Sequence, residues 1–116
     1  MWIFTRHGFF SVVAKKSDPE TLKVRGRCRA DLDALLAFVA REAPCVRSDF
    51  SDIVETPLRD YWFRVFVPRS SWVAVAGILA SDIDYTNFKR EVHGNPARDR
   101  AYLSVWSAMN RFQAEN

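Results

Sequence analysis

The spacing of apolar residues changes near residue 30, and this change is the strongest constraint on the fold. Across residues 22–28, L-K-V-R-G-R-C, basic and apolar positions alternate strictly, which is typical of a strand with one face in water. From Asp31 onward, apolar side chains recur at helical spacing: Leu32, Leu35, Leu36, Val39 and Ala43. Pro44 stops this pattern, so we expect an amphipathic helix that follows the strand and ends there.

An N-terminal hairpin is expected before this strand. Aromatic and β-branched residues fill positions 2–4 and 9–14, and His7-Gly8 separates the two runs. Gly8 can supply the positive φ that a tight turn or a bulge requires. The pattern therefore predicts two short strands joined at His7-Gly8.

Two more strands are expected in the second half of the chain. The short apolar pair at 53–54 and the run Y-W-F-R-V-F-V at 61–67 carry the signal. The second run is apolar on both faces apart from Arg64, so we expect a central strand that is covered on both sides.

Two further helices are expected after this strand. Ser70 or Ser71 is the predicted N-cap of the first, and Asn95-Pro96 begins the last, since an N-cap followed by proline is a helix start. The apolar stripe of the last helix is Tyr102, Val105, Trp106, Met109 and Phe112.

The order of these elements predicts an α+β fold with an antiparallel sheet of four or five strands, packed by helices. The β-α-β-β-α core has an N-terminal hairpin before it and an extra C-terminal helix after it. It resembles a ferredoxin-like sandwich in which the N-terminal strands replace the missing last strand. A chain of 116 residues has the length of one domain, so we expect a single domain over residues 1–116.

The composition predicts a globular cytoplasmic protein. With 48% hydrophobic and 27% charged residues, the chain is too apolar to be disordered. It shows neither the features of a signal peptide nor a run of about 18 apolar residues that could cross a bilayer. We therefore expect no membrane partner. Two cysteines do not make a disulfide framework, so we expect reduced thiols.

The sequence lacks the usual patterns of catalytic and metal sites. Its two histidines and two cysteines lie far apart, without metal-ligand spacing. Its four glycines do not cluster into a phosphate-binding or dinucleotide-binding loop. We therefore expect no metal, no cofactor and no enzymatic activity. An enzyme built from His7, Asp84, Tyr85 and Lys89 is the least favoured alternative.

The stretch S-D-I-D-Y-T-N-F-K-R-E-V-H-G at 81–94 gathers polar side chains that are common in active sites. A polar cleft formed with the N-terminal turn would contain His7, Asp84, Tyr85, Asn87 and Lys89. The favoured interpretation is a structural joint before the last helix. In that joint Asp84 caps a turn and Phe88 enters the core.

A basic face on the alternating strand is the best binding candidate, and its residues are Lys23, Arg25, Arg27 and Arg29. Such a face could follow a phosphate backbone, as strand-based readers of nucleic acids do. The strand itself has no aromatic residues on which bases could stack. The competing interpretation is therefore a solvated edge strand that carries charge against aggregation, and the net charge of +3 is too small to imply nucleic acid alone.

Three stretches taken together resemble a family of small uncharacterised proteins found in bacteria and bacteriophages. They are M-W-I-F-T-R-H-G-F-F-S-V-V at 1–13, I-D-Y-T-N-F-K at 83–89 and Y-L-S-V-W-S-A-M at 102–109. The resemblance covers nearly the whole chain and implies no particular activity. The bacteriophage members suggest an inhibitor of host defence, similar to an anti-CRISPR protein.

From these observations we expect a non-enzymatic binding module that acts through a protein partner and forms a homodimer. The expected dimer interface is the second apolar face of the strand at 61–67. The alternative functions are weak nucleic-acid binding through the basic strand and the inhibition of host defence.

Overall fold

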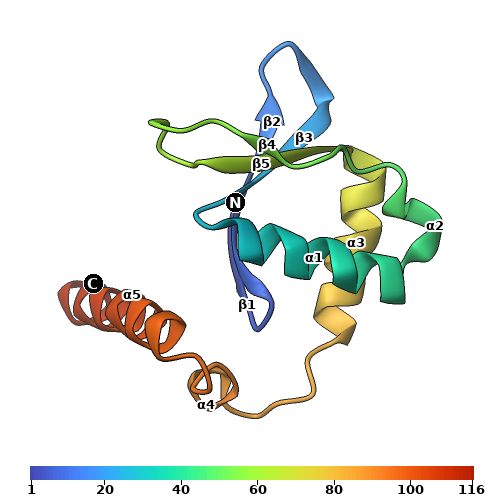
Figure 1. Cartoon of the computed structure of the whole chain (residues 1–116). Helices are drawn as coiled ribbons and strands as arrows, with labels where there is room; N and C mark the ends of the chain where they lie inside the picture. The colour runs from blue at the N-terminus through green and yellow to red at the C-terminus, as the bar shows by residue number, and fades with distance from the viewer. The chain divides into compact units, whose positions relative to one another are not determined.

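The computed structural model describes all 116 residues (Figure 1). The chain divides into two compact units, Met1–Ile83 and Asp84–Asn116. The first unit contains the sheet and three helices, and the second contains the remaining two helices.

The first unit is built on one five-stranded antiparallel sheet with the strand order β1-β2-β3-β5-β4. The strands are β1 (Trp2–Thr5), β2 (Gly8–Lys15), β3 (Asp18–Gly26), β4 (Val54–Glu55) and β5 (Phe63–Pro68). Because β3 and β4 both pair antiparallel with β5, the connection from β3 to β4 joins two parallel strands with β5 between them. The expected α+β fold with an open antiparallel sheet is confirmed.

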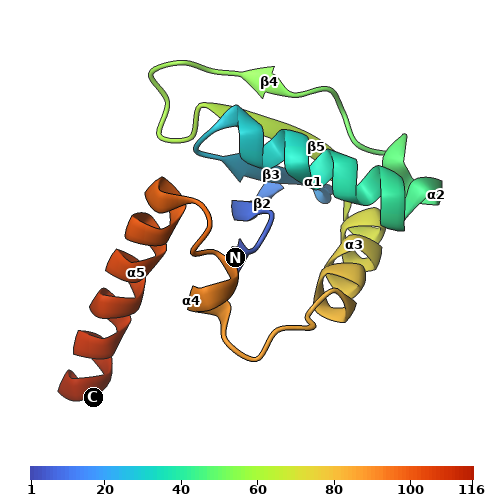
Figure 2. The ribbon, with the colours of Figure 1, turned by 60° about the horizontal axis from the view of Figure 1, so that its bottom comes forward.

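Helices cover one face of this sheet. They are α1 (Arg29–Glu42) and α3 (Arg69–Ser81), and Figure 2 shows α1 lying along the sheet. The short α2 (Pro44–Arg47) follows α1 and has no buried residue. Apolar side chains of the sheet, α1 and α3 are completely buried between these layers: Phe10, Val24, Leu32, Leu35, Val39, Val65 and Val75. Each such side chain contributes roughly 1.5–3 kcal/mol relative to an exposed position, so this layer holds the unit together.

Gly8 closes the β1–β2 hairpin as the sequence predicts. Its φ is 156°, and a Cβ at this position would lie 2.6 Å from Cγ of Asp31. The buried Asp31 carboxylate accepts a hydrogen bond of 3.0 Å from the backbone N–H of Phe9. The first turn of α1 is thereby fastened to the hairpin.

The second unit consists of α4 (Phe88–Glu91) and α5 (Pro96–Glu115). The side chain of Asn95 accepts a hydrogen bond from the N–H of Arg98, which confirms the expected start of the last helix. The ring of Phe88 lies 5.7 Å from that of Tyr102. The apolar stripe of α5 belongs to a helix without a single buried residue.

The 81–94 stretch differs in detail from the expected joint. Asn87, not Asp84, is the N-cap of α4, and it accepts a hydrogen bond of 3.0 Å from the N–H of Arg90. Phe88 is only half-buried and lies outside the core cluster of the first unit. The ring of Phe88 instead packs against Tyr85 and Tyr102 inside the second unit.

The prediction that β5 is covered on both faces is wrong. Val65 and Val67 are buried, whereas Arg64 and Phe66 on the other face are only half-buried. The reason is that α1 and α3 bury the apolar residues of a single sheet face. Along β5, Phe63, Val65 and Val67 therefore face the core, whereas Arg64 and Phe66 face the other side of the sheet.

Three residues near helix ends also differ from the sequence predictions. Ser71 does not cap α3, which begins after Pro68 without a side-chain cap, and the Ser71 hydroxyl donates instead to Asp49 at 2.6 Å. Cys28 was expected on the apolar side of a strand but is exposed just before α1. The apolar spacing of Trp72, Val75, Ala76 and Leu79 predicts that Ile83 continues the buried stripe of this helix, but Ile83 lies beyond the last turn of α3 and is 58% exposed.

Candidate functional site

The sheet face opposite α1 and α3 combines basic and aromatic side chains. The register places Trp2, Ser11, Arg25 and Arg64 in one row across four strands. Neighbouring rows add Phe4 beside Phe9, and Lys23 beside Phe66. We call this surface the open face; its residues are Trp2, Phe4, Phe9, Ser11, Lys23, Arg25, Arg64 and Phe66.

Two arginines lie directly opposite each other at the centre of the open face. Arg25 of β3 pairs in register with Arg64 of β5, and like charges in this position destabilise a sheet. Arg25 donates a hydrogen bond of 2.8 Å to the Ser11 hydroxyl. Arg64 donates to the Thr56 hydroxyl and to the carbonyl of Tyr61. Neither arginine forms an ion pair, and the Nε atoms of both are buried without an acceptor.

The electrostatics of Arg64 reflect this missing counter-charge. Burial lowers the pKa of its guanidinium, and the positive charges of Arg25 and Arg59 lower it further. An anion placed against the Arg25–Arg64 pair would reverse the effect of these neighbouring charges. The centre of the open face is therefore suited to bind an anionic group.

The ring of Tyr61 lies beneath the guanidinium groups of Arg25 and Arg27. Its side chain is only 3% exposed, and the guanidinium carbons of Arg25 and Arg27 lie 4.6 and 4.0 Å from its ring centre. Arg27 also forms an exposed ion pair of 2.7 Å with Asp60, and the hydrogen bond that it donates to this carboxylate raises the pKa of Arg27. Arg27 is thus partly neutralised, in contrast to Arg25 and Arg64.

Aromatic rings lie beside the basic side chains on the open face. Phe4 and Phe9 stack with their centres 4.6 Å apart, and Trp2 meets Phe9 edge-on at 5.8 Å. Trp2 is 67% exposed, and Phe66 is half-buried on β5. The basic strand alone has no aromatic residues, but strand pairing supplies them from β1, β2 and β5.

The competing interpretation of the basic strand as an edge strand is wrong. β3 pairs with β2 on one side and with β5 on the other, so charge at this position is not explained by protection of an edge. Lys23 and Arg25 belong to the strand, whereas Arg27 follows its last residue. Arg29 is the first residue of α1 and lies 3.8 Å from Asp33.

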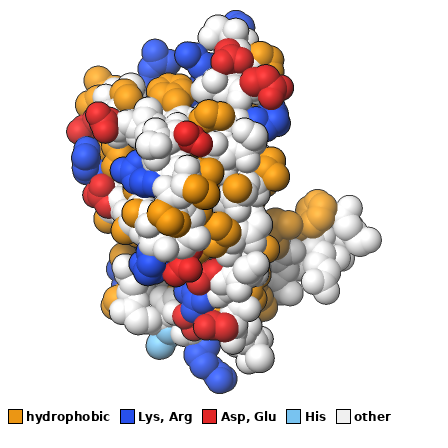
Figure 3. Space-filling view, turned by 90° about the vertical axis from the view of Figure 1, so that its right-hand side faces the viewer, with side chains coloured by type: hydrophobic (Ala, Val, Ile, Leu, Met, Phe, Trp, Pro, Cys, Tyr) orange, Lys and Arg blue, Asp and Glu red, His pale blue; other side chains and the backbone are white.

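Charges are distributed differently on the side formed by α2 and α3. Figure 3 shows acidic, basic and hydrophobic side chains interspersed over this surface. By comparison, no acidic residue occupies the rows of the open face. The basic character of the molecule is therefore localised and exceeds what the net charge of +3 suggests.

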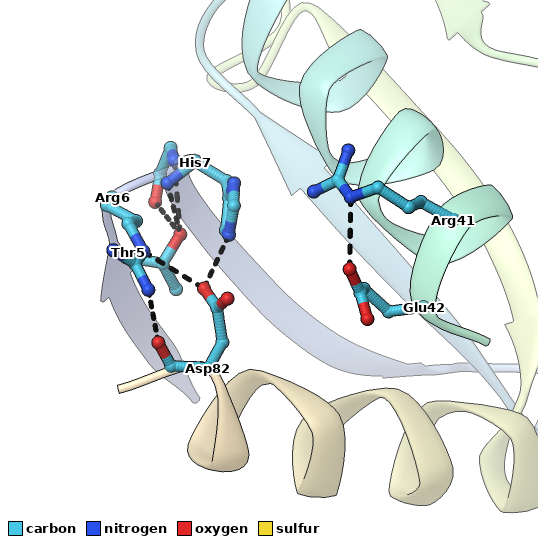
Figure 4. Close-up of polar contacts among 7 residues, drawn as sticks. Thr5, Arg6, His7, Arg41, Glu42 and Asp82 are labelled. Carbon is cyan, nitrogen blue, oxygen red and sulfur yellow. Dashed lines mark hydrogen bonds and ion pairs between the residues drawn. The ribbon is translucent and has the colours of Figure 1, made fainter. Parts of the chain in front are cut away.

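His7 belongs to an ion-pair cluster at the tip of the β1–β2 hairpin (Figure 4). Its Nε2 lies 2.8 Å from the Asp82 carboxylate, which also accepts a 3.0 Å hydrogen bond from Arg6. Arg6 donates a further hydrogen bond to the Asp82 carbonyl, and the His7 ring packs on Phe38. Burial raises the pKa of Asp82, but the hydrogen bonds and charges of Arg6 and His7 outweigh this effect and leave it below its usual range. We interpret the cluster as a tie between the hairpin and the end of α3.

The other residues of the predicted polar cleft belong to the second unit: Asp84, Tyr85, Asn87 and Lys89. Asn87 caps α4, and the Lys89 ammonium lies 4.3 Å from the centre of the Trp106 ring. Tyr85 packs against Phe88. Three of these four side chains thus have structural contacts within their own unit, and the cleft itself stays a prediction.

The sequence patterns did not indicate Arg64 and Tyr61 as residues of a site, and they did not indicate that Asp82 contacts His7. Arg64 was detectable as the single charge in an otherwise apolar run, but its pairing with Arg25 depends on the register of distant strands. No three His, Cys, Asp or Glu side chains converge where they could hold a metal ion. None of the helices is both long enough and apolar enough to cross a membrane.

Comparison with known proteins gives no match to the chain: neither family models, nor curated proteins, nor solved structures resemble it significantly.

Proposed function

We propose that this protein is a non-enzymatic binding module and that its open face binds single-stranded nucleic acid. The supporting observation is that Arg25 and Arg64, which lie opposite each other and form no ion pair, are surrounded by aromatic rings on a sheet surface without carboxylates. Phosphates would supply the missing negative charge, and bases could stack on the exposed rings. Sheet surfaces that combine these two features are a recurring platform for single-stranded RNA.

The type of nucleic acid follows from the shape of this surface. A sheet with half-buried rings presents flat stacking positions, which require unpaired bases. A duplex hides its bases in a stack and would meet only the cations. We therefore expect single strands to bind more tightly than a duplex of the same length.

A protein partner is the second candidate. Exposed apolar side chains of α5 support it: Leu103, Val105, Trp106, Met109 and Phe112. These residues are also a better candidate for the homodimer interface than the second face of β5, because that face is basic. Inhibition of host defence rests on the sequence resemblance alone.

Two further proposals concern the type of fold and the cellular location. Because β2 lies beside β3, in the position of a last strand that the chain lacks, we describe the first unit as a ferredoxin-like variant. The fold does not determine the function. We keep the cytoplasm as the proposed location.

Fluorescence anisotropy with labelled 20-nucleotide RNA, DNA and duplex probes tests the proposed function. We expect affinity for single strands to fall with salt, with a slope of about −0.7 for each phosphate contact. Arg25→Gln and Arg64→Gln should each weaken binding about 10-fold or more, because a charge-assisted hydrogen bond contributes roughly 1.5–3 kcal/mol.

Arg41→Gln is the matched control, since Arg41 lies on α1 and pairs with Glu42 (Figure 4). It should leave the affinity within about 2-fold, which is the scale of a surface substitution. Thermal melts of all variants establish that they are folded. Equal effects of Arg25→Gln and Arg41→Gln, or no binding at low salt, would contradict the proposal.

A further inference from the structure

We infer that the open face ends in a site for a terminal phosphate monoester, so that the protein holds a nucleic-acid strand by its phosphorylated end. The inference rests on the proposed function and adds a ligand class to it. A groove beside the β2–β3 turn carries it, with Lys15, Lys16, Ser17, Lys23, Arg64 and Phe66 along its walls.

The groove has the size of a small-molecule site, and most of its lining residues are basic. Its volume is about 590 Å³, within the range of roughly 300–1,000 Å³ that is common for small-molecule sites. Three lysines, one arginine and one serine line it together with a single aromatic ring. Acidic residues are absent from its lining.

The basic side chains of the groove form no ion pairs, although Asp18 lies opposite Lys15 in the strand register. Lys15, Lys16 and Lys23 form no ion pair, and the Arg64 Nε atom is buried without an acceptor. The Lys15 ammonium lies 5.5 Å from the centre of the Phe66 ring. The positive charge is thus concentrated around one aromatic surface and is available to a ligand.

A phosphate monoester fits this charge better than a phosphodiester does. A monoester carries about 1.5 to 2 negative charges at neutral pH and offers three strong acceptor oxygens, whereas each internal diester carries one charge. Lysine binds phosphate as a point charge and arginine binds it directionally. The Ser17 hydroxyl can donate to a further oxygen, and the Phe66 ring can stack on the terminal base.

The position of the groove explains why it would bind a strand end. The β2–β3 turn closes the sheet beside Lys15 and Lys16. From there the rows lead through Lys23 and Phe66 to the Arg25–Arg64 pair. A strand whose terminal phosphate occupies the groove can continue over the arginines toward Phe9 and Phe4. Beyond the turn the sheet ends, so no further strand extends this surface in the opposite direction.

Three versions of one 12-nucleotide RNA test this site: one with hydroxyl groups at both ends, one with a 5′-phosphate and one with a 3′-phosphate. We expect one phosphorylated probe to bind at least 10-fold more tightly than the unphosphorylated probe. Because the second pKa of a phosphate monoester is about 6, this preference should shrink between pH 7.5 and pH 5.5. The probe that gains affinity identifies the end that is recognised.

Lys15→Gln combined with Lys16→Gln should abolish the phosphate preference and leave affinity for the unphosphorylated probe within about 2-fold. Arg41→Gln is the control and should retain the preference. Equal affinity for all three probes would overturn the terminal site while leaving the proposed function intact. Failure of every probe to bind would overturn both.

Discussion

At Gly8 the backbone φ is 156°, and a Cβ would come within 2.6 Å of the Asp31 side chain. Asp31 is itself buried and holds the N–H of Phe9. A larger residue must therefore distort the hairpin or displace the first turn of α1. Gly77 is a contrasting glycine, because it is exposed within α3 and a Cβ there would meet no atom within 4 Å.

We predict opposite effects on stability for alanine at these two positions. Gly8→Ala should lower the free energy of unfolding by about 1–3 kcal/mol, the usual cost of overpacking. Gly77→Ala should raise it by about 0.5–1 kcal/mol, because alanine is favoured over glycine inside a helix. Urea denaturation of both variants measures this, and a stabilised Gly8→Ala protein would contradict the account of the hairpin.

At the scale of elements, the ion-pair cluster connects the β1–β2 hairpin to the residue after α3. Asp82 accepts hydrogen bonds from Arg6 and His7 across more than 70 residues of sequence. These interactions hold together two elements that lie far apart in the sequence of the first unit. Their strength depends on the ionised form of the carboxylate, so they should respond to acid.

We predict that Asp82 makes stability depend on pH at acidic values. Its pKa is lower in the folded chain than in the unfolded chain, where aspartate has a pKa of about 3.9. Its contribution is therefore complete above that unfolded pKa and is lost as pH falls through the lower folded pKa. In urea denaturation, Asp82→Asn should be less stable than the unchanged protein at pH 7, and this difference should shrink at pH 3. A constant difference at both pH values would exclude the ionised tie.

At the scale of the whole molecule, the hydrophobic core cluster lies within the first unit. All residues of the hydrophobic core cluster precede Ile83, and the proposed binding surface precedes it too. In the second unit, α5 has no buried residue, whereas most of the stability of a protein helix comes from tertiary packing of an apolar face. The two units should therefore differ in their ability to fold alone.

We predict that a chain ending at Ile83 folds cooperatively and binds single-stranded probes with an affinity within about 3-fold of the full chain, equivalent to roughly 0.65 kcal/mol. Thermal melting and anisotropy measure the two properties. Sedimentation equilibrium adds a readout for the proposed homodimer: the full chain should associate, and the shorter chain should stay monomeric because it lacks the apolar stripe of α5. Unfolding of the shorter chain would show that the second unit completes the core.

Local patterns in the sequence determined most of the elements of this protein. The alternation at 22–28, the helical spacing after Asp31, Gly8 in the hairpin and Asn95-Pro96 at the start of α5 act through neighbours in the chain. A single sequence displays such interactions directly. The antiparallel α+β class follows from the order of the elements, since short connections join neighbouring strands and helices pack on sheets.

Only the tertiary structure determined which side chains from different elements lie together on one surface. The sequence shows that Arg25 alternates with apolar residues, but pairing with β5 places Arg64 opposite it, and pairing with β2 places Ser11 beside it. The aromatic rings of the open face come from β1, β2 and β5, so no inspection of β3 alone reveals them. Asp82 likewise meets His7 through long-range packing. The physical reason is that register and layer packing are set by contacts between distant segments, whereas periodicity and capping depend on residues a few positions apart.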